Sequence, residues 1–121
     1  MSQEVPPMLR EHLVRFDQLQ QNLQAIFVQK QQVDLELAEI DRALAELKKA
    51  TPEETVYKSA GSILIRVNRD DVVKELEEKK ELDNTRIAVL TKQEHRARDS
   101  ATDLQTKIEE MVRGRAPPPP A

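Results

Sequence analysis

Few side chains in this sequence could take part in catalysis or metal binding, and their spacing builds no site. The only histidines are His12 and His95, and the chain has no cysteine, which argues against a disulfide or a thiolate metal site. Adjacent carboxylates such as Glu77 and Glu78 point apart on a helix, where no cleft would desolvate them. Two glycines in total are too few for a glycine-rich phosphate loop. The sequence therefore predicts no enzyme, no cofactor and no metal site.

The composition favours long helices over a globular core. Among 121 residues there is no Trp, one Tyr and two Phe, while 34% are Asp, Glu, Lys or Arg, a balance typical of coiled coils. Disorder is the competing interpretation, and regular apolar spacing argues against it. The net charge of −3 comes from interspersed acids and bases, so we expect no nucleic-acid partner. No apolar run is long enough for a bilayer and the N-terminus does not resemble a signal peptide, so we expect a cytoplasmic protein without a membrane partner.

The first half of the chain has a heptad pattern, with apolar residues at alternating spacings of three and four. Only His12 and Lys30 interrupt it. Two prolines at positions 6 and 7 fit only before or within a first helical turn. We therefore predict a flexible segment over 1–7 and a coiled-coil helix over 8–50. The pattern comprises Val5, Leu9, His12, Phe16, Leu19, Leu23, Ile26, Lys30, Val33, Leu37, Ile40, Leu44 and Leu47.

The second half repeats this pattern and predicts a second coiled-coil helix over 72–113. Asn68 or Asp70 could cap its start, and Gly114 suits its C-terminal cap. The proline-rich residues 114–121 are expected to form a disordered tail. The pattern comprises Val73, Leu76, Lys80, Asp83, Ile87, Leu90, Glu94, Ala97, Ala101, Leu104, Ile108 and Met111.

Two seams of nearly equal length predict an antiparallel coiled coil within one chain. If the helix ends are flush, Leu47 lies beside Val73 and Leu9 beside Met111. A slip of one heptad would satisfy the periodicity equally well, so the flush ends select this register. The alternative is a parallel coiled coil of two chains, which would leave the segment between the helices without a role.

The linker over 51–71 contains a predicted β-hairpin. Residues 55–67 read TVYKSAGSILIRV, with β-prone runs on both sides of Gly61. Apolar residues on both faces would be unstable in water, and an isolated hairpin is marginal. We therefore expect a mainly α fold in which hairpins from several subunits join into an intersubunit β-barrel. The predicted assembly residues are Val56, Tyr57, Gly61, Ile63, Leu64, Ile65 and Val67.

This hairpin resembles that of the prefoldin beta subunits of the archaeal type. The likeness rests on VYKSAGSILIRV at 56–67, FDQLQQ at 16–21 and VQKQ at 28–31, and covers about 9–114. The resemblance implies a hexamer of two alpha-type and four beta-type subunits, a co-chaperone of group II chaperonins. Its partners would be an alpha-type subunit, further copies of this chain, unfolded proteins and the chaperonin. The ending over 113–121, rich in Arg and Pro, departs from the usual family pattern.

Surplus apolar residues near the outer helix ends predict where unfolded clients bind. Met8, Leu13 and Val14 are apolar outside the seam, and single exposed apolar residues are also ordinary on protein surfaces. Phe27 and Val28 could extend a client surface or pack on a neighbouring arm. The predicted client-binding residues are Met8, Leu9, Leu13, Val14, Phe16, Ile108, Met111 and Val112.

Two functions from different classes fit these features. The first is an ATP-independent chaperone subunit, a holdase that captures unfolded polypeptides at the coiled-coil tips and delivers them to a group II chaperonin. The second is a structural scaffold or tether that joins specific folded partners. A charged docking site for the chaperonin around Lys107, Arg113 and Arg115 could accompany the first function.

Overall fold

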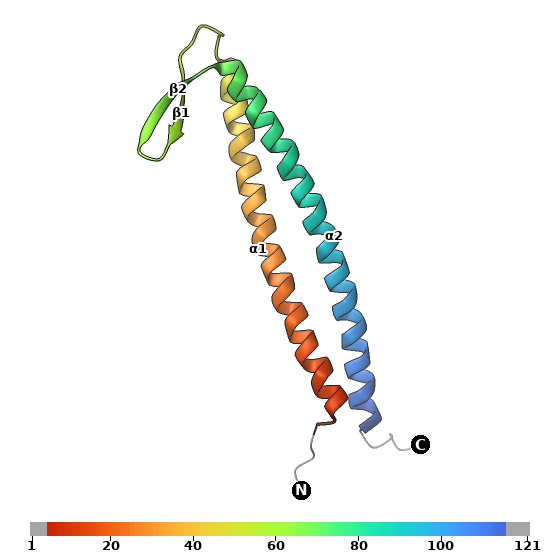
Figure 1. The fold of residues 1–121 in the computed structure, drawn as a ribbon. Helices are drawn as coiled ribbons and strands as arrows, with labels where there is room; N and C mark the ends of the chain where they lie inside the picture. Colours follow the sequence, from red (N-terminus) through yellow and green to blue (C-terminus); the bar gives the residue numbers. More distant parts are fainter. Residues whose placement is uncertain (1–4, 116–121) are drawn as a thin grey trace. The chain divides into compact units, whose positions relative to one another are not determined.

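The computed structural model describes residues 5–115, which form two long helices with a β-hairpin between them (Figure 1). This confirms the predicted mainly α fold with one hairpin. Contacts divide the chain into two compact units. The hairpin unit is Lys30–Val89, and the terminal unit comprises the described parts of 1–29 and 90–121. The elements in chain order are α1 (Pro7–Lys49), β1 (Val56–Ala60), β2 (Ile63–Val67) and α2 (Arg69–Arg115).

Helix α1 begins at a proline. Pro7 is its first residue, one position before the expected start, and the Arg10 amide donates to the Pro6 carbonyl at 3.0 Å. Proline suits this position because the first helical N–H groups have no partner within the helix. Of the segment predicted to be flexible, residues 1–4 lie outside the described residues. After the helix ends at Lys49, a single turn is closed by the Glu54 amide on the Thr51 carbonyl at 3.0 Å.

Helix α2 is capped by Asn68 and not by Asp70. The Asn68 side-chain oxygen accepts a hydrogen bond from the Asp71 amide at 3.1 Å, and its carbonyl accepts one from Val72 at 3.1 Å. Asp70 instead lies in the first turn, where a negative charge is favoured by the helix dipole. The helix consequently starts at Arg69, earlier than the predicted residue 72.

The C-terminal end of α2 runs further than expected. The helix continues through Gly114 to Arg115, and among the described residues Gly61 is the only glycine with positive φ. Gly114 therefore does not form the predicted left-handed cap. The remainder of the predicted tail, 116–121, lies outside the described residues.

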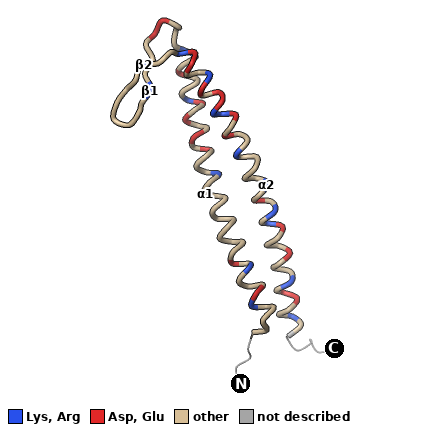
Figure 2. The backbone as a smooth tube through the Cα atoms, in the orientation of Figure 1, with Lys and Arg blue, Asp and Glu red and all other residues tan. Residues whose placement is uncertain are grey.

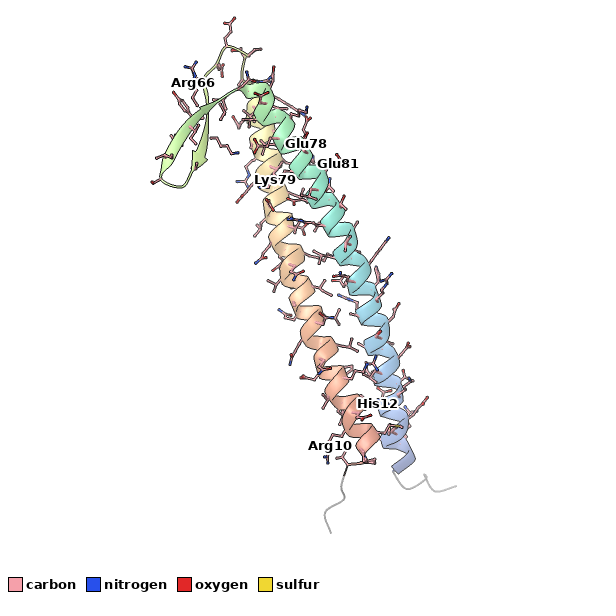
Figure 3. All side chains as sticks on the ribbon, viewed as in Figure 1. Arg10, His12, Arg66, Glu78, Lys79 and Glu81 are labelled. Carbon is pink, nitrogen blue, oxygen red and sulfur yellow. The ribbon has the colours of Figure 1, made fainter. Side chains whose placement is uncertain are left out.

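In the hairpin unit the two helix segments are antiparallel (Figure 1) and are joined by cross-helix ion pairs. Lys79, which is labelled in Figure 3, reaches from α2 to Glu36 at 2.7 Å, and Lys80 reaches Asp41 at 2.7 Å. The flush register places residue 79 opposite Asp41, one position from Lys80, so the Lys80–Asp41 pair agrees with it. Lys79 lies five positions, roughly 7.5 Å along the axis, from the residue that faces Glu36, and its long side chain spans that offset. Ile40 and Leu44 are buried in the seam.

In the terminal unit buried apolar residues from both helices line the seam. All of them occupy positions of the predicted heptad patterns. The buried residues of this unit are Leu9, Ile26, Leu90, Ala97, Ala101 and Leu104.

Arg69 connects the two helices of the hairpin unit at the ends next to the hairpin. Its Nε donates to the Leu47 carbonyl at 2.7 Å, and its side chain is only 20% exposed. The Leu47 carbonyl lies in the last turn of α1, where carbonyls lack helical partners and attract cations. Arg69 thereby caps α1 from the first residue of α2.

Replacing Arg69 with alanine is expected to lower the free energy of unfolding by about 1–2 kcal/mol, because a charge-assisted hydrogen bond is lost. Chemical denaturation at one fixed protomer concentration measures this, since oligomers unfold in a concentration-dependent way. Arg42→Ala, at an exposed position of α1, is the control and should change stability by less than about 0.5 kcal/mol. Equal effects of the two substitutions would contradict the capping role.

Candidate functional site

The hairpin turn has the geometry that its glycine permits. Ala60 pairs with Ile63 across the two loop residues Gly61 and Ser62, and Gly61 has φ of 61°. Positive φ occurs among the described residues only at this glycine, so Ser62 has negative φ, as in a type II′ turn. Such a turn matches the twist of the strands. It holds the five-pair register from Val56↔Val67 to Ala60↔Ile63.

Both faces of the hairpin expose apolar side chains. Cross-strand partners share a face, which places Ile63 and Ile65 on one face and Leu64 with Tyr57 on the other. Leu64 is 70% exposed, and Tyr57, Ile63 and Ile65 are also exposed. Val56 and Val67, at the base of the hairpin, are half-buried. The predicted assembly residues therefore all lie on the β1–β2 hairpin.

Each strand of this two-stranded sheet also has a free hydrogen-bonding edge. Two strands alone are marginally stable in water, and an exposed apolar edge pairs readily with another strand. The Lys58 ammonium contacts the Glu75 carboxylate on α2 at 2.7 Å, and this hydrogen bond lowers the pKa of Glu75. That pair tethers β1 to α2, and leaves the apolar side chains of the hairpin exposed for contact with another chain.

The terminal unit exposes part of the predicted client-binding set. Met8 is 61% exposed, and Leu13, Val14 and Val112 are also exposed. We call these four residues the terminal surface. Phe16, Ile108 and Met111 are half-buried, so they lie between seam and surface. Leu9 is only 4% exposed and contributes to the seam.

A shallow groove in the terminal unit was missed by the sequence analysis. Its cavity of about 450 Å³ is lined by residues of both helices, including Phe16, Phe27, Arg98 and Ala101. The sequence contains a feature that indicates such a groove. Two successive seam positions, 97 and 101, are alanines, whose side chains are smaller than those of the other apolar seam residues. Apart from Phe16, the α1 residues that line the groove fall in 18–29, a stretch without charged residues (Figure 2). Phe27 is 50% exposed.

The ionisable residues singled out in the sequence lie along the two helices. His12, on α1 (Figure 3), is half-buried, whereas His95, Glu77 and Glu78 are exposed. Within 5–115, no group of three or more His, Cys, Asp or Glu is placed to hold a metal ion. Over the same residues, neither helix contains a stretch long and apolar enough to cross a bilayer.

Comparison with known proteins places this arrangement in a family. A family profile described as "Prefoldin subunit" matches residues 10–115. The chain belongs to the prefoldin family. It is 39% identical over 109 residues to prefoldin subunit beta of Archaeoglobus fulgidus, covering 90% of this chain and 94% of that one. It is 37% identical over 112 residues to prefoldin subunit beta of Caldivirga maquilingensis, covering 93% of each chain.

A solved prefoldin structure agrees with these sequence matches. The crystal structure of the prefoldin beta subunit from Thermococcus strain KS-1 superposes with a TM-score of 0.81 at 33% identity. The match covers 96% of this chain and 100% of that one. The resemblance to beta-type prefoldin subunits, first seen in the hairpin, is therefore confirmed, and with it membership of a chaperone family.

Proposed function

We propose that this prefoldin-family chain is one subunit of an ATP-independent holdase in the cytoplasm. The complex would contain two alpha-type subunits and four copies of this chain. It would capture unfolded polypeptides at the terminal units and deliver them to a group II chaperonin. Family membership supports the chaperone class, and the exposed apolar side chains of the terminal surface carry the proposed capture step.

Capture at the terminal surface is supported by the burial of seam residues in the same unit. A two-helix coiled coil needs only its seam to be apolar, and here Leu9 and Leu104 are already buried. Met8, Leu13 and Val14 therefore contribute little to helix pairing, yet each is exposed. Unbranched methionine can adapt to varied partners, which suits a surface that binds many non-native chains.

Assembly is proposed to run through the hairpin. Strand edges and apolar faces of several hairpins would be covered together if the strands joined into a β-barrel, because closure removes free edges. The exposed Ile63, Leu64 and Ile65 would then be buried between subunits. The terminal units would remain available to clients.

The function is tested by diluting a chemically denatured client into buffer with the co-purified complex and no nucleotide, and recording light scattering. Suppression of aggregation at stoichiometric complex is the expected result, since capture shields apolar surface without ATP. Assembly of the complex is verified in the same buffer by size-exclusion chromatography. An intact complex that leaves scattering unchanged would refute the holdase and favour the scaffold or tether that joins folded partners.

A further inference from the structure

Asp83 is a charged side chain placed in an apolar seam. It lies on α2 in the hairpin unit with 0% of its surface exposed, and as a carboxylate it accepts no hydrogen bond at either oxygen. Buried carboxylates are normally paired or hydrogen-bonded, because burial without partners is costly. The sequence places Asp83 at a position of the second heptad pattern, but its complete burial was not predicted.

The cations near Asp83 are occupied elsewhere or too distant. Lys79 contacts Glu36 at 2.7 Å and Lys80 contacts Asp41 at 2.7 Å, both across the helix pair. Arg86 Nη1 is 3.6 Å from Asp83 Oδ1 and largely exposed, a separation too long for a good hydrogen bond. The acids of α1 thus hold both lysines, and the buried acid of α2 has only a weak ion pair.

The electrostatic surroundings disfavour the charged form of Asp83. Burial raises the pKa of its carboxyl, and the neighbouring Glu36 carboxylate raises it further, against smaller opposing effects of Arg86 and Lys79. The hydrogen bond from Lys79 lowers the pKa of Glu36, and Glu36 in turn raises the pKa of Lys79. Glu36 and Lys79 are therefore stabilised in their charged forms, while Asp83 is stabilised as the neutral acid.

We propose that Asp83 is a proton-dependent opening point in the helix pair of the hairpin unit. With a proton bound, the seam closes around a neutral carboxyl group. Without it, the carboxylate can regain water only if the two helices separate locally around residue 83. A polar seam residue is known to specify coiled-coil pairing at a cost in stability, and here that cost depends on pH.

The sign of the pH dependence around residue 83 follows from the shifted pKa values of Asp83, Glu36 and Lys79. Asp83 has a folded pKa above its ordinary 3.8, so its contribution is fully present below that value and is lost as pH rises through the raised pKa. Glu36 behaves oppositely, and its contribution is lost only as pH falls below its ordinary 4.5. Lys79 keeps its contribution up to about its ordinary 10.5. Between pH 4.5 and 8, local opening therefore reports on Asp83.

Amide hydrogen exchange on the assembled complex tests this proposal. Opening of the α2 segment around residue 83 is measured from pH 4 to 8, after correction for intrinsic exchange rates. Opening in the wild type should increase as pH rises above the ordinary 3.8 of Asp83, by at most about tenfold per unit, and level off above the raised pKa. Asp83→Asn should lack this rise and be more protected than the wild type at pH 8. Asp34→Asn, at an exposed position of α1 in the same unit, should follow the wild type.

A second variant tests whether the opening depends on protonation of Asp83 and is not a general effect of substitution. Glu36→Gln removes the neighbouring negative charge and frees Lys79 to pair with Asp83, so the pH-dependent opening should move to lower pH. A wild-type profile that is flat, or an Asp83→Asn variant that opens more than the wild type at pH 8, would overturn the proposal. The latter result would mean that Asp83 is stabilised as a carboxylate.

Discussion

Replacing both Ile63 and Ile65 with aspartate is expected to abolish assembly of the complex while the helices remain folded. Both side chains are exposed on one face of the hairpin. Burial of each would contribute about 1.5–3 kcal/mol at an interface, and a buried unpaired carboxylate adds a larger penalty. Both substitutions are present in every copy of this chain in the complex, so their effects act together. Light scattering coupled to size-exclusion chromatography should show loss of the large oligomer.

A charge placed elsewhere in the same hairpin provides the control. Ser62→Asp adds a carboxylate in the loop without removing an apolar side chain, and it should leave the oligomer intact. Leu64→Asp probes the opposite face, since Leu64 pairs with Ser59 and not with the isoleucine face. Disassembly by Leu64→Asp as well would indicate that both faces are covered. A complex of unchanged mass after the double isoleucine substitution would refute assembly through the hairpin.

Changing Met8, Leu13 and Val14 to serine is expected to weaken client capture at least tenfold in an intact complex. These residues are exposed on the terminal unit, so their loss removes apolar contact area from the client without opening the seam. Each tenfold change corresponds to about 1.4 kcal/mol, less than the burial of one large apolar side chain. Capture is measured as the concentration of complex that halves aggregation of a denatured client.

The matched control removes three exposed apolar residues from the other unit. Leu35, Leu82 and Val89 are exposed in the hairpin unit, and their replacement by serine should leave capture within about twofold of the wild type. Leu9 is excluded from the test because it is buried and its change would destabilise the seam. Equal losses in both triple variants would show that capture depends on total apolar surface and has no specific site.

The helices and the hairpin were predictable because they depend on short-range patterns. Spacings of three and four place side chains on one face of any helix, and β-branched residues around Gly61 favour a tight hairpin. The residues at which the helices begin and end were less predictable. Asn68 and Asp70 are both good caps, and only the formed hydrogen bond from the Asp71 amide selects Asn68.

The sequence by itself determined the two helices, the hairpin between them and the family to which the chain belongs. Tertiary structure decided which residues are surface and which are seam, because exposure depends on the facing helix. Met8 and Leu9 are adjacent apolar residues, yet one is exposed and the other buried. The heptad pattern places Asp83 at a seam position, but only the packing of the two helices shows that its side chain is completely buried.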